Sequence, residues 1–85
     1  MTKYEFPKIS IVIPTLGRSK LEECIKSIRY NYYPNYEIIT SDIKGLCKAR
    51  NDGLNRAKGK IVIFTDDDVL ISSRYLFKIA RTFDD

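Results

Sequence analysis

Three consecutive aspartates follow a short apolar stretch of the chain. Asp66, Asp67 and Asp68 come directly after Ile61–Thr65, and neighbouring like charges are unfavourable unless solvent or a cation compensates them. In extended backbone, side chains at positions i and i+2 point to the same side, so Asp66 and Asp68 can share a ligand while Asp67 points away. One or two carboxylates, with waters and phosphates, hold hard ions such as Mg²⁺ and Mn²⁺. The alternative is a solvated turn at a helix start, where the helix dipole also favours acids.

Two other segments carry residues suited to ligand binding. The basic segment 44–60 contains glycines that permit close backbone approach, and Arg50 offers a forked donor for a phosphate or carboxylate. The alternative is a surface helix with a basic face. Asp42 follows a second apolar stretch and could accept hydrogen bonds from a ribose or base, or could cap the next helix. Histidine is absent, which excludes Ser-His and Cys-His nucleophilic sites and zinc sites with histidine ligands.

The remaining polar and aromatic features carry less chemical information. Tyrosines in the segment 29–36 could stack on a base or sugar, but such residues more often pack a helix end against a loop. The net charge of +4 suits an anionic ligand, yet no RNA- or DNA-binding signature accompanies the lysines and arginines, so we expect no nucleic-acid partner. Cys24 and Cys47 are not at metal-ligand spacing and are interpreted as small core residues.

Alternating strand and helix patterns must position these residues. The β-branched stretch Ile9–Pro14 predicts a buried strand, and Tyr36–Ser41 and Lys60–Thr65 predict two more. Ser19 with Glu22 forms a capping-box pattern before the first helix, whose inward stripe is Leu21, Cys24, Ile25 and Ile28. The second helix is expected from Lys44, with Gly59 as its stop and an inward stripe of Leu46, Ala49, Gly53, Leu54 and Ala57. Ser72 or Ser73 could cap a last helix, with Leu76, Ile79, Ala80 and Phe83 buried.

The order β-α-β-α-β-α predicts one small α/β domain that spans residues 1–85. We expect a three-layer α/β/α sandwich with a three-stranded parallel sheet in the order 2-1-3 and the first two helices on opposite faces. Ligands of such sheets bind beyond the carboxyl ends of the strands, where the strand order reverses. Pro14–Thr15, Asp42 and Asp66–Asp68 all follow strand ends, so we expect them to converge at one edge.

Three segments, ISIVIPTLGRSKLEECIKSI, YPNYEIITSD and GLCKARNDGLNRAKGKIVIFTDDDV, give the chain a resemblance to a known family. From Ile9 to about Phe83 it resembles the N-terminal, donor-binding half of a family 2 glycosyltransferase with the Rossmann-like GT-A fold. The most specific part is the ordered set Gly45, Ala49-Arg50-Asn51, Gly53, Ala57 and Gly59 before the strand that enters Asp66–Asp68.

The resemblance implies transfer of a sugar from a UDP- or GDP-sugar, with Mn²⁺ or Mg²⁺ at a DXD motif. It implies that Asp66 and Asp68 are the metal ligands. The residues that it implies at the nucleotide-diphospho-sugar are Pro14, Thr15, Asp42, Arg50, Asp66 and Asp67.

The sequence departs from the family pattern at several points. Gly17 stands where the family usually has Asn, Ile43-Lys44 replace a second acid with Gly-Ser, and a strand that normally follows Asp42 is missing. Nothing in the sequence matches the acceptor half or its catalytic base, so the catalytic residue stays unknown. We therefore expect transfer only if a partner chain supplies the acceptor half.

A different class of function stays open. A three-stranded sheet leaves two edges that invite pairing with another chain, so the alternative is a non-catalytic α/β module for oligomerisation or assembly. A magnesium-dependent phosphoacceptor module is disfavoured. The acids of such modules belong to different strand ends and are joined by a lysine after a later strand, whereas the acids of this chain cluster after one strand. No apolar run approaches the roughly 18 residues of a membrane span, so we expect a cytoplasmic protein, either free or at the inner face of the membrane.

Overall fold

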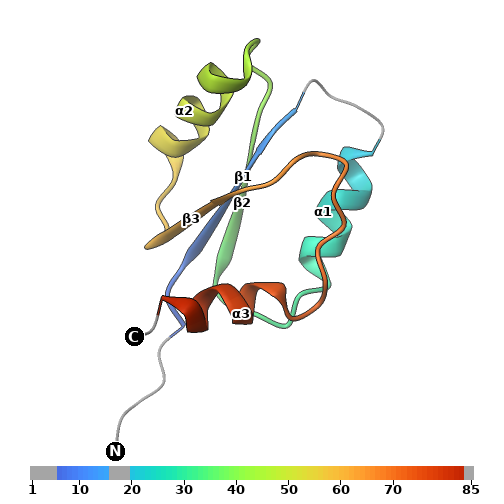
Figure 1. Ribbon diagram of the computed structural model, residues 1–85, viewed down its shortest axis with the longest axis vertical. Helices are drawn as coiled ribbons and strands as arrows, with labels where there is room; N and C mark the ends of the chain where they lie inside the picture. Colours follow the sequence, from blue (N-terminus) through green and yellow to red (C-terminus); the bar gives the residue numbers. More distant parts are fainter. Residues whose placement is uncertain (1–5, 16–19, 84–85) are drawn as a thin grey trace, which may run out of the picture.

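A single parallel sheet forms the centre of the computed structural model, which describes residues 6–15 and 20–83. The strands are β1 (Ile9–Pro14), β2 (Tyr36–Ser41) and β3 (Ile61–Phe64), in the order β2-β1-β3. The helices are α1 (Leu21–Arg29), α2 (Leu46–Arg56) and α3 (Tyr75–Thr82). Figure 1 shows this alternating order, which confirms the predicted α/β class, strand order and parallel pairing.

The three strands begin together but end at different levels. Ile9 pairs with Tyr36 and with Ile61, whereas β3 stops where Phe64 pairs with Val12, two positions before the end of β1. The Thr65 N–H still donates to the Val12 carbonyl at 3.0 Å. Because β3 is shorter, the chain leaves the sheet early and brings the acidic run beside the end of β1.

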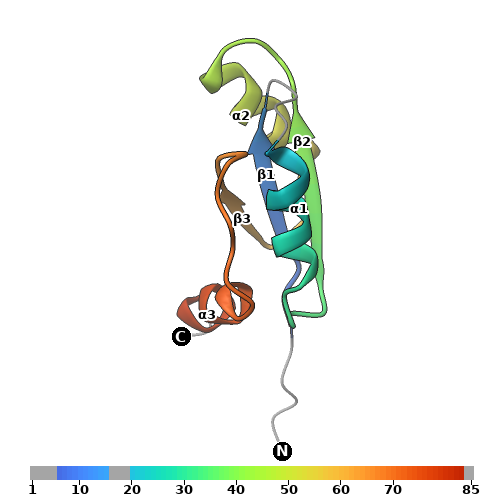
Figure 2. The ribbon, with the colours of Figure 1, turned by 90° about the vertical axis from the view of Figure 1, so that its right-hand side faces the viewer.

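The two faces of β1 contact different helices. Its odd-numbered residues, Ile9, Ile11 and Ile13, are fully buried in one cluster with side chains of α1 and α3 (Cys24, Ile28, Leu76 and Ala80). Val12 faces the other way, toward α2. The first two helices therefore lie on opposite sides of the sheet, as predicted, and α3 shares the side of α1 near the amino-terminal end of the strands (Figures 1 and 2).

Helix α2 approaches the sheet through a narrow stripe of small residues. A Cβ atom on Gly53 would lie 2.2 Å from the Val12 Cγ1 atom, so only glycine permits this distance. Ala49 is buried beside it, but Leu46 and Leu54 are about half exposed, at 54% and 48%. The prediction that both leucines face the core is therefore wrong, because a helix this close to the sheet buries only its nearest residues.

Gly59 has a packing role in place of the predicted helix stop. α2 ends at Arg56, and the extended Ala57 follows as its C-cap. A Cβ on Gly59 would lie 2.5 Å from the Ser10 Oγ, which accepts the Gly59 N–H at 2.7 Å and donates to the Glu37 carboxylate. The pKa of Glu37 is lowered, chiefly by this Ser10 hydrogen bond. Ser10 thus joins β1 to β2 and to the segment that leads into β3.

An asparagine from a distant loop caps α3, so the prediction of Ser72 or Ser73 as its cap is wrong. Arg74 occupies the N-cap position without a side-chain cap. The Leu76 N–H donates to Asn31 Oδ1 at 3.1 Å, and Asn31 Nδ2 donates to the Ser72 carbonyl at 3.0 Å. Ser19, the predicted cap of α1, lies outside the described residues, as does Gly17.

Aromatic packing also differs from the predicted stripe of α3. Phe83 is exposed, whereas Phe77 packs edge-on against Phe6 and Tyr33 with ring centroids 5.8 and 5.2 Å apart. Tyr33 is buried and its hydroxyl donates to the Pro7 carbonyl. At Tyr33 the structure therefore supports the packing interpretation of the tyrosines.

The contact between α2 and the sheet can be tested at Gly53. We expect Gly53→Ala to lower the free energy of unfolding by about 1–3 kcal/mol through overpacking, despite a gain of about 1 kcal/mol in helix propensity. In a Val12→Ala background, which removes the clashing methyl groups, the same change should cost less. Urea denaturation measures both values, and equal costs in the two backgrounds would contradict this account.

Candidate functional site

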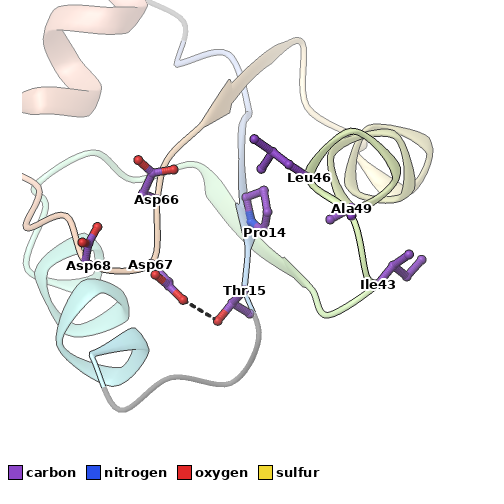
Figure 3. A pocket seen from close by; sticks show the side chains of 9 residues that line it. Pro14, Thr15, Ile43, Leu46, Ala49, Asp66, Asp67 and Asp68 are labelled. Atoms are coloured by element: carbon purple, nitrogen blue, oxygen red, sulfur yellow. Dashed lines mark hydrogen bonds between the residues drawn. The ribbon is translucent and has the colours of Figure 1, made fainter.

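A pocket of about 390 Å³ lies at the carboxyl edge of the sheet (Figure 3). It is bounded by the end of β1, the connection into α2 and the acidic run. Its lining residues are Pro14, Thr15, Ile43, Gly45, Leu46, Ala49, Asp66, Asp67 and Asp68. Two of the three polar features that were expected to converge, Pro14–Thr15 and the acidic run, therefore meet here.

The three aspartates are divided between two sides of the backbone. Thr15 Oγ1 donates a 2.8 Å hydrogen bond to Asp67 Oδ2, and both residues are buried. Asp66 and Asp68 are exposed, and their carboxylates point the other way from that of Asp67 (Figure 3). The predicted opposite orientation of Asp67 is therefore confirmed, and a ligand shared by Asp66 and Asp68 stays a prediction.

The acidic run is a turn and not the extended segment that the i, i+2 argument assumed. The Val69 N–H donates to the Asp66 carbonyl at 3.3 Å, and α3 begins only at Tyr75. The alternative interpretation was a solvated turn at a helix start. The turn is confirmed, but the helix start is wrong, because α3 begins seven residues after Asp68. Cys24 Sγ also contacts the Asp66 carbonyl at 3.6 Å, which links the turn to α1.

The two cysteines have different environments. Cys24 is buried, and its pKa is raised by burial and by the nearby charges of Asp67 and Asp68. Cys47 is exposed in the first turn of α2, so its assignment to the core is wrong. Burial and the neighbouring acids therefore disfavour the thiolate form of Cys24, whereas Cys47 faces solvent.

Asp42 lies exposed just after β2, and the pocket is lined by Ile43 and Gly45 in its place. It does not cap α2, because Gly45 occupies the N-cap position with a φ of 99°, a conformation that favours glycine. A role for Asp42 at a ribose or base stays a prediction.

Arg50 lies beside the pocket, on the exposed side of α2. Its guanidinium carbon is 5.8 Å from the centroid of the Phe64 ring, a distance typical of a cation–π contact. Arg50 lines a neighbouring hollow of about 250 Å³ together with Pro14, Phe64, Thr65, Asp66 and Val69. The structure thus brings Arg50 and Asp66 to the same hollow, and a phosphate role for Arg50 stays a prediction.

The apolar side of the pocket was not predicted from the sequence. Ile43, Leu46 and Ala49 line it opposite the carboxylates, so one wall is apolar and the other is acidic. The helical spacing of Leu46 and Ala49 indicated core positions, and Leu46 is instead half exposed at the pocket. The positive φ of Gly45 turns the chain here, and a glycine after a strand end was the only sequence signal for this wall.

The donor set at the turn fits a hard divalent cation. Asp66 and Asp68 supply two exposed carboxylates on one side, and Mg²⁺ is commonly held by one or two carboxylates with waters and phosphates. Among residues 6–15 and 20–83, no three His, Cys, Asp or Glu side chains form a closed metal site. A cation here would complete its coordination with waters or with oxygens of a bound substrate.

Comparison with known protein families identifies the family of this chain. A model of glycosyl transferase family 2 matches residues 39–85, more than half of the sequence, from within β2 through the acidic run and α3. The chain belongs to glycosyltransferase family 2. The resemblance deduced from the motifs is therefore confirmed, and the acidic run falls inside the matched region of this family 2 chain.

One relative of this family 2 chain is GalNAc(5)-diNAcBac-PP-undecaprenol beta-1,3-glucosyltransferase of Campylobacter jejuni. The two are 32% identical over an alignment of 92 positions, which covers 73% of this chain and 30% of the relative. The chain thus spans less than a third of that protein's length. In the described part of the chain, no helix is long and apolar enough to cross a membrane.

The hydrogen bond between Thr15 and Asp67 can be tested by removing its donor. Thr15→Val should lower the free energy of unfolding by about 1.5–3 kcal/mol, because the buried Asp67 carboxylate loses a charge-assisted hydrogen bond. Thr65→Val is the matched control, since that hydroxyl makes only a 3.5 Å contact with the Asp66 carbonyl. Urea denaturation measures both variants, and equal losses would show that the Thr15–Asp67 bond contributes little.

Proposed function

We propose that this chain is the donor-binding part of a glycosyltransferase, which binds a UDP- or GDP-sugar in the pocket at the carboxyl edge of the sheet. One observation carries the proposal. The exposed carboxylates of Asp66 and Asp68 line a pocket at the point where the strand order reverses. Membership of glycosyltransferase family 2 supports glycosyl transfer as the general reaction.

Each wall of the pocket has a proposed part in donor binding. Pro14, Leu46 and Ala49 offer an apolar surface to the base or ribose. Thr15 holds Asp67 in place as part of the acidic wall. Arg50, in the adjoining hollow, is placed to donate to a phosphate oxygen.

We assign Asp66 and Asp68 as the residues that would hold Mg²⁺ or Mn²⁺ together with the diphosphate. When bound, such an ion supplies Lewis-acid stabilisation of the leaving diphosphate. The two carboxylates also keep an unliganded pocket strongly negative, so a nucleotide diphosphate should bind poorly without the cation.

Transfer to an acceptor needs a general base, and we propose that a partner chain or a further segment supplies it with the acceptor half. The name of the Campylobacter relative describes an undecaprenol-linked acceptor. We propose that the acceptor here is also lipid-linked, so that the assembled enzyme works at the inner, cytoplasmic face of a membrane.

The donor proposal predicts metal-dependent nucleotide binding. Calorimetric titration of the chain with UDP-glucose and GDP-mannose, with and without Mn²⁺, should give binding that weakens at least about tenfold when the metal is chelated. The variant Asp66→Asn/Asp68→Asn should lose this metal dependence. Glu22→Gln/Glu23→Gln, which removes two exposed carboxylates of α1, is the matched control and should bind as the original chain does.

Two results would overturn the donor proposal. One is the absence of binding to either nucleotide sugar at millimolar concentration in the presence of Mn²⁺. The other is an equal, metal-independent affinity in the Asp66→Asn/Asp68→Asn variant, because the carboxylates would then have no part in binding.

A non-catalytic assembly module is the second candidate, and the outer edge of β3 favours it. In the described part of the chain β3 pairs only with β1, and Phe64 at its end is 44% exposed. An unpaired edge with an apolar side chain invites addition of another strand. If assembly is the function, multi-angle light scattering should show a stable oligomer that nucleotide does not alter, whereas a monomer that binds nucleotide opposes this reading.

A further inference from the structure

A third cavity, a hollow of about 440 Å³, lies along α3. Tyr32, Arg74, Phe77, Lys78 and Arg81 line it. α3 crosses the amino-terminal end of the strands, so this hollow and the acidic pocket lie at opposite ends of the sheet (Figures 1 and 2). No part of the donor site uses these residues.

Three cationic side chains share one side of α3. Arg74, Lys78 and Arg81 are spaced by four and three positions, which aligns them along the helix, and all three are exposed. Within residues 6–15 and 20–83, the ion pairs join Lys8 with Glu37 and Arg56 with Asp52, and no carboxylate lies within 4.0 Å of these three cations. Their charge in the described structure is therefore directed to solvent.

An exposed aromatic ring borders the same surface. Tyr32, which lines the hollow, is 69% exposed, unlike the buried Tyr33. The Tyr32 N–H donates to the Ser73 carbonyl at 3.1 Å, and Asn31 caps α3. These bonds fix the loop that carries Tyr32 to the basic helix, so the Tyr32 ring and the cations form one surface, here called the α3 surface (Tyr32, Arg74, Lys78 and Arg81).

We infer that the α3 surface docks the chain on a bilayer of anionic lipids. Its cations extend over about 10 Å, because seven residues of α-helix rise by that length. This length exceeds the size of one phosphate and matches a layer of several headgroups. Basic residues near an anionic bilayer bind by electrostatic attraction, and tyrosine rings partition into the interface. A single soluble phosphate would leave most of this surface unused.

Docking in this way orients the chain. The acidic run lies at the other end of the sheet, so a bilayer bound by the α3 surface lies away from the pocket. The pocket then faces the aqueous phase. This inference adds to the proposed donor function and does not depend on it, because lipid binding is measured without nucleotide or metal.

The test uses cosedimentation of the whole chain with sucrose-loaded vesicles. We expect partitioning into vesicles of phosphatidylcholine mixed equally with phosphatidylglycerol, and little into phosphatidylcholine alone. Arg74→Gln/Lys78→Gln/Arg81→Gln should reduce the partition coefficient roughly 100-fold, because each cation near an anionic surface contributes about fivefold. Circular dichroism confirms that the variant is folded.

The matched control is Lys20→Gln/Lys44→Gln/Lys48→Gln. It removes the same charge from three exposed positions, the N-cap of α1, the connection into α2 and the first turn of α2, and should retain most of the binding. Equal losses in the two triple variants would overturn the inference, since net charge alone would then explain binding. Equal partitioning into neutral and anionic vesicles, or none into either, would also overturn it. A third result would also overturn the inference. If the original chain bound single-stranded DNA but no vesicles, and the α3 variant lost the DNA binding, the surface would recognise nucleic acid.

Discussion

Parallel pairing of β1 with both of its neighbours is the constraint on which the rest of the molecule depends. Because β1 is central, its side chains are buried on both faces, with isoleucines toward α1 and α3 and Val12 toward α2. The same pairing brings the carboxyl ends of all three strands to one edge. The early end of β3 then places the acidic turn beside Thr15, which gives the pocket its polar wall.

Most of the fold could be predicted from the sequence because it depends on local patterns. The strands β1 and β2 were predicted with their observed bounds, and strand order followed from the alternation of strands and helices. The predictions that failed concerned contacts whose geometry depends on the distances between elements. Periodicity marks a helix face, but it does not say that Gly53 brings α2 so close that Leu46 and Leu54 stay outside. Similarly, the cap of α3 comes from Asn31, 45 residues before Leu76 in the chain, beyond any local capping pattern.

The sequence predicted which kinds of residue gather at the candidate site better than it predicted how they contact one another. The position of the aspartates after a strand indicated a ligand-binding edge, and the family match includes them. The sequence did not indicate that Asp67 is held by Thr15, because 52 residues separate them and only the sheet joins them. It also did not reveal the apolar wall, since a half-exposed leucine at a pocket has the same helical spacing as one in a core.

The contrast between the two cysteines has a practical consequence. Cys24 is buried with a raised pKa, so it forms the reactive thiolate rarely and is sheltered from alkylating reagents. Cys47 is exposed and follows Leu46, which lines the pocket. A thiol-directed fluorophore should therefore label the native chain at one position. That position adjoins the pocket wall, where the dye would report occupancy without any engineered residue.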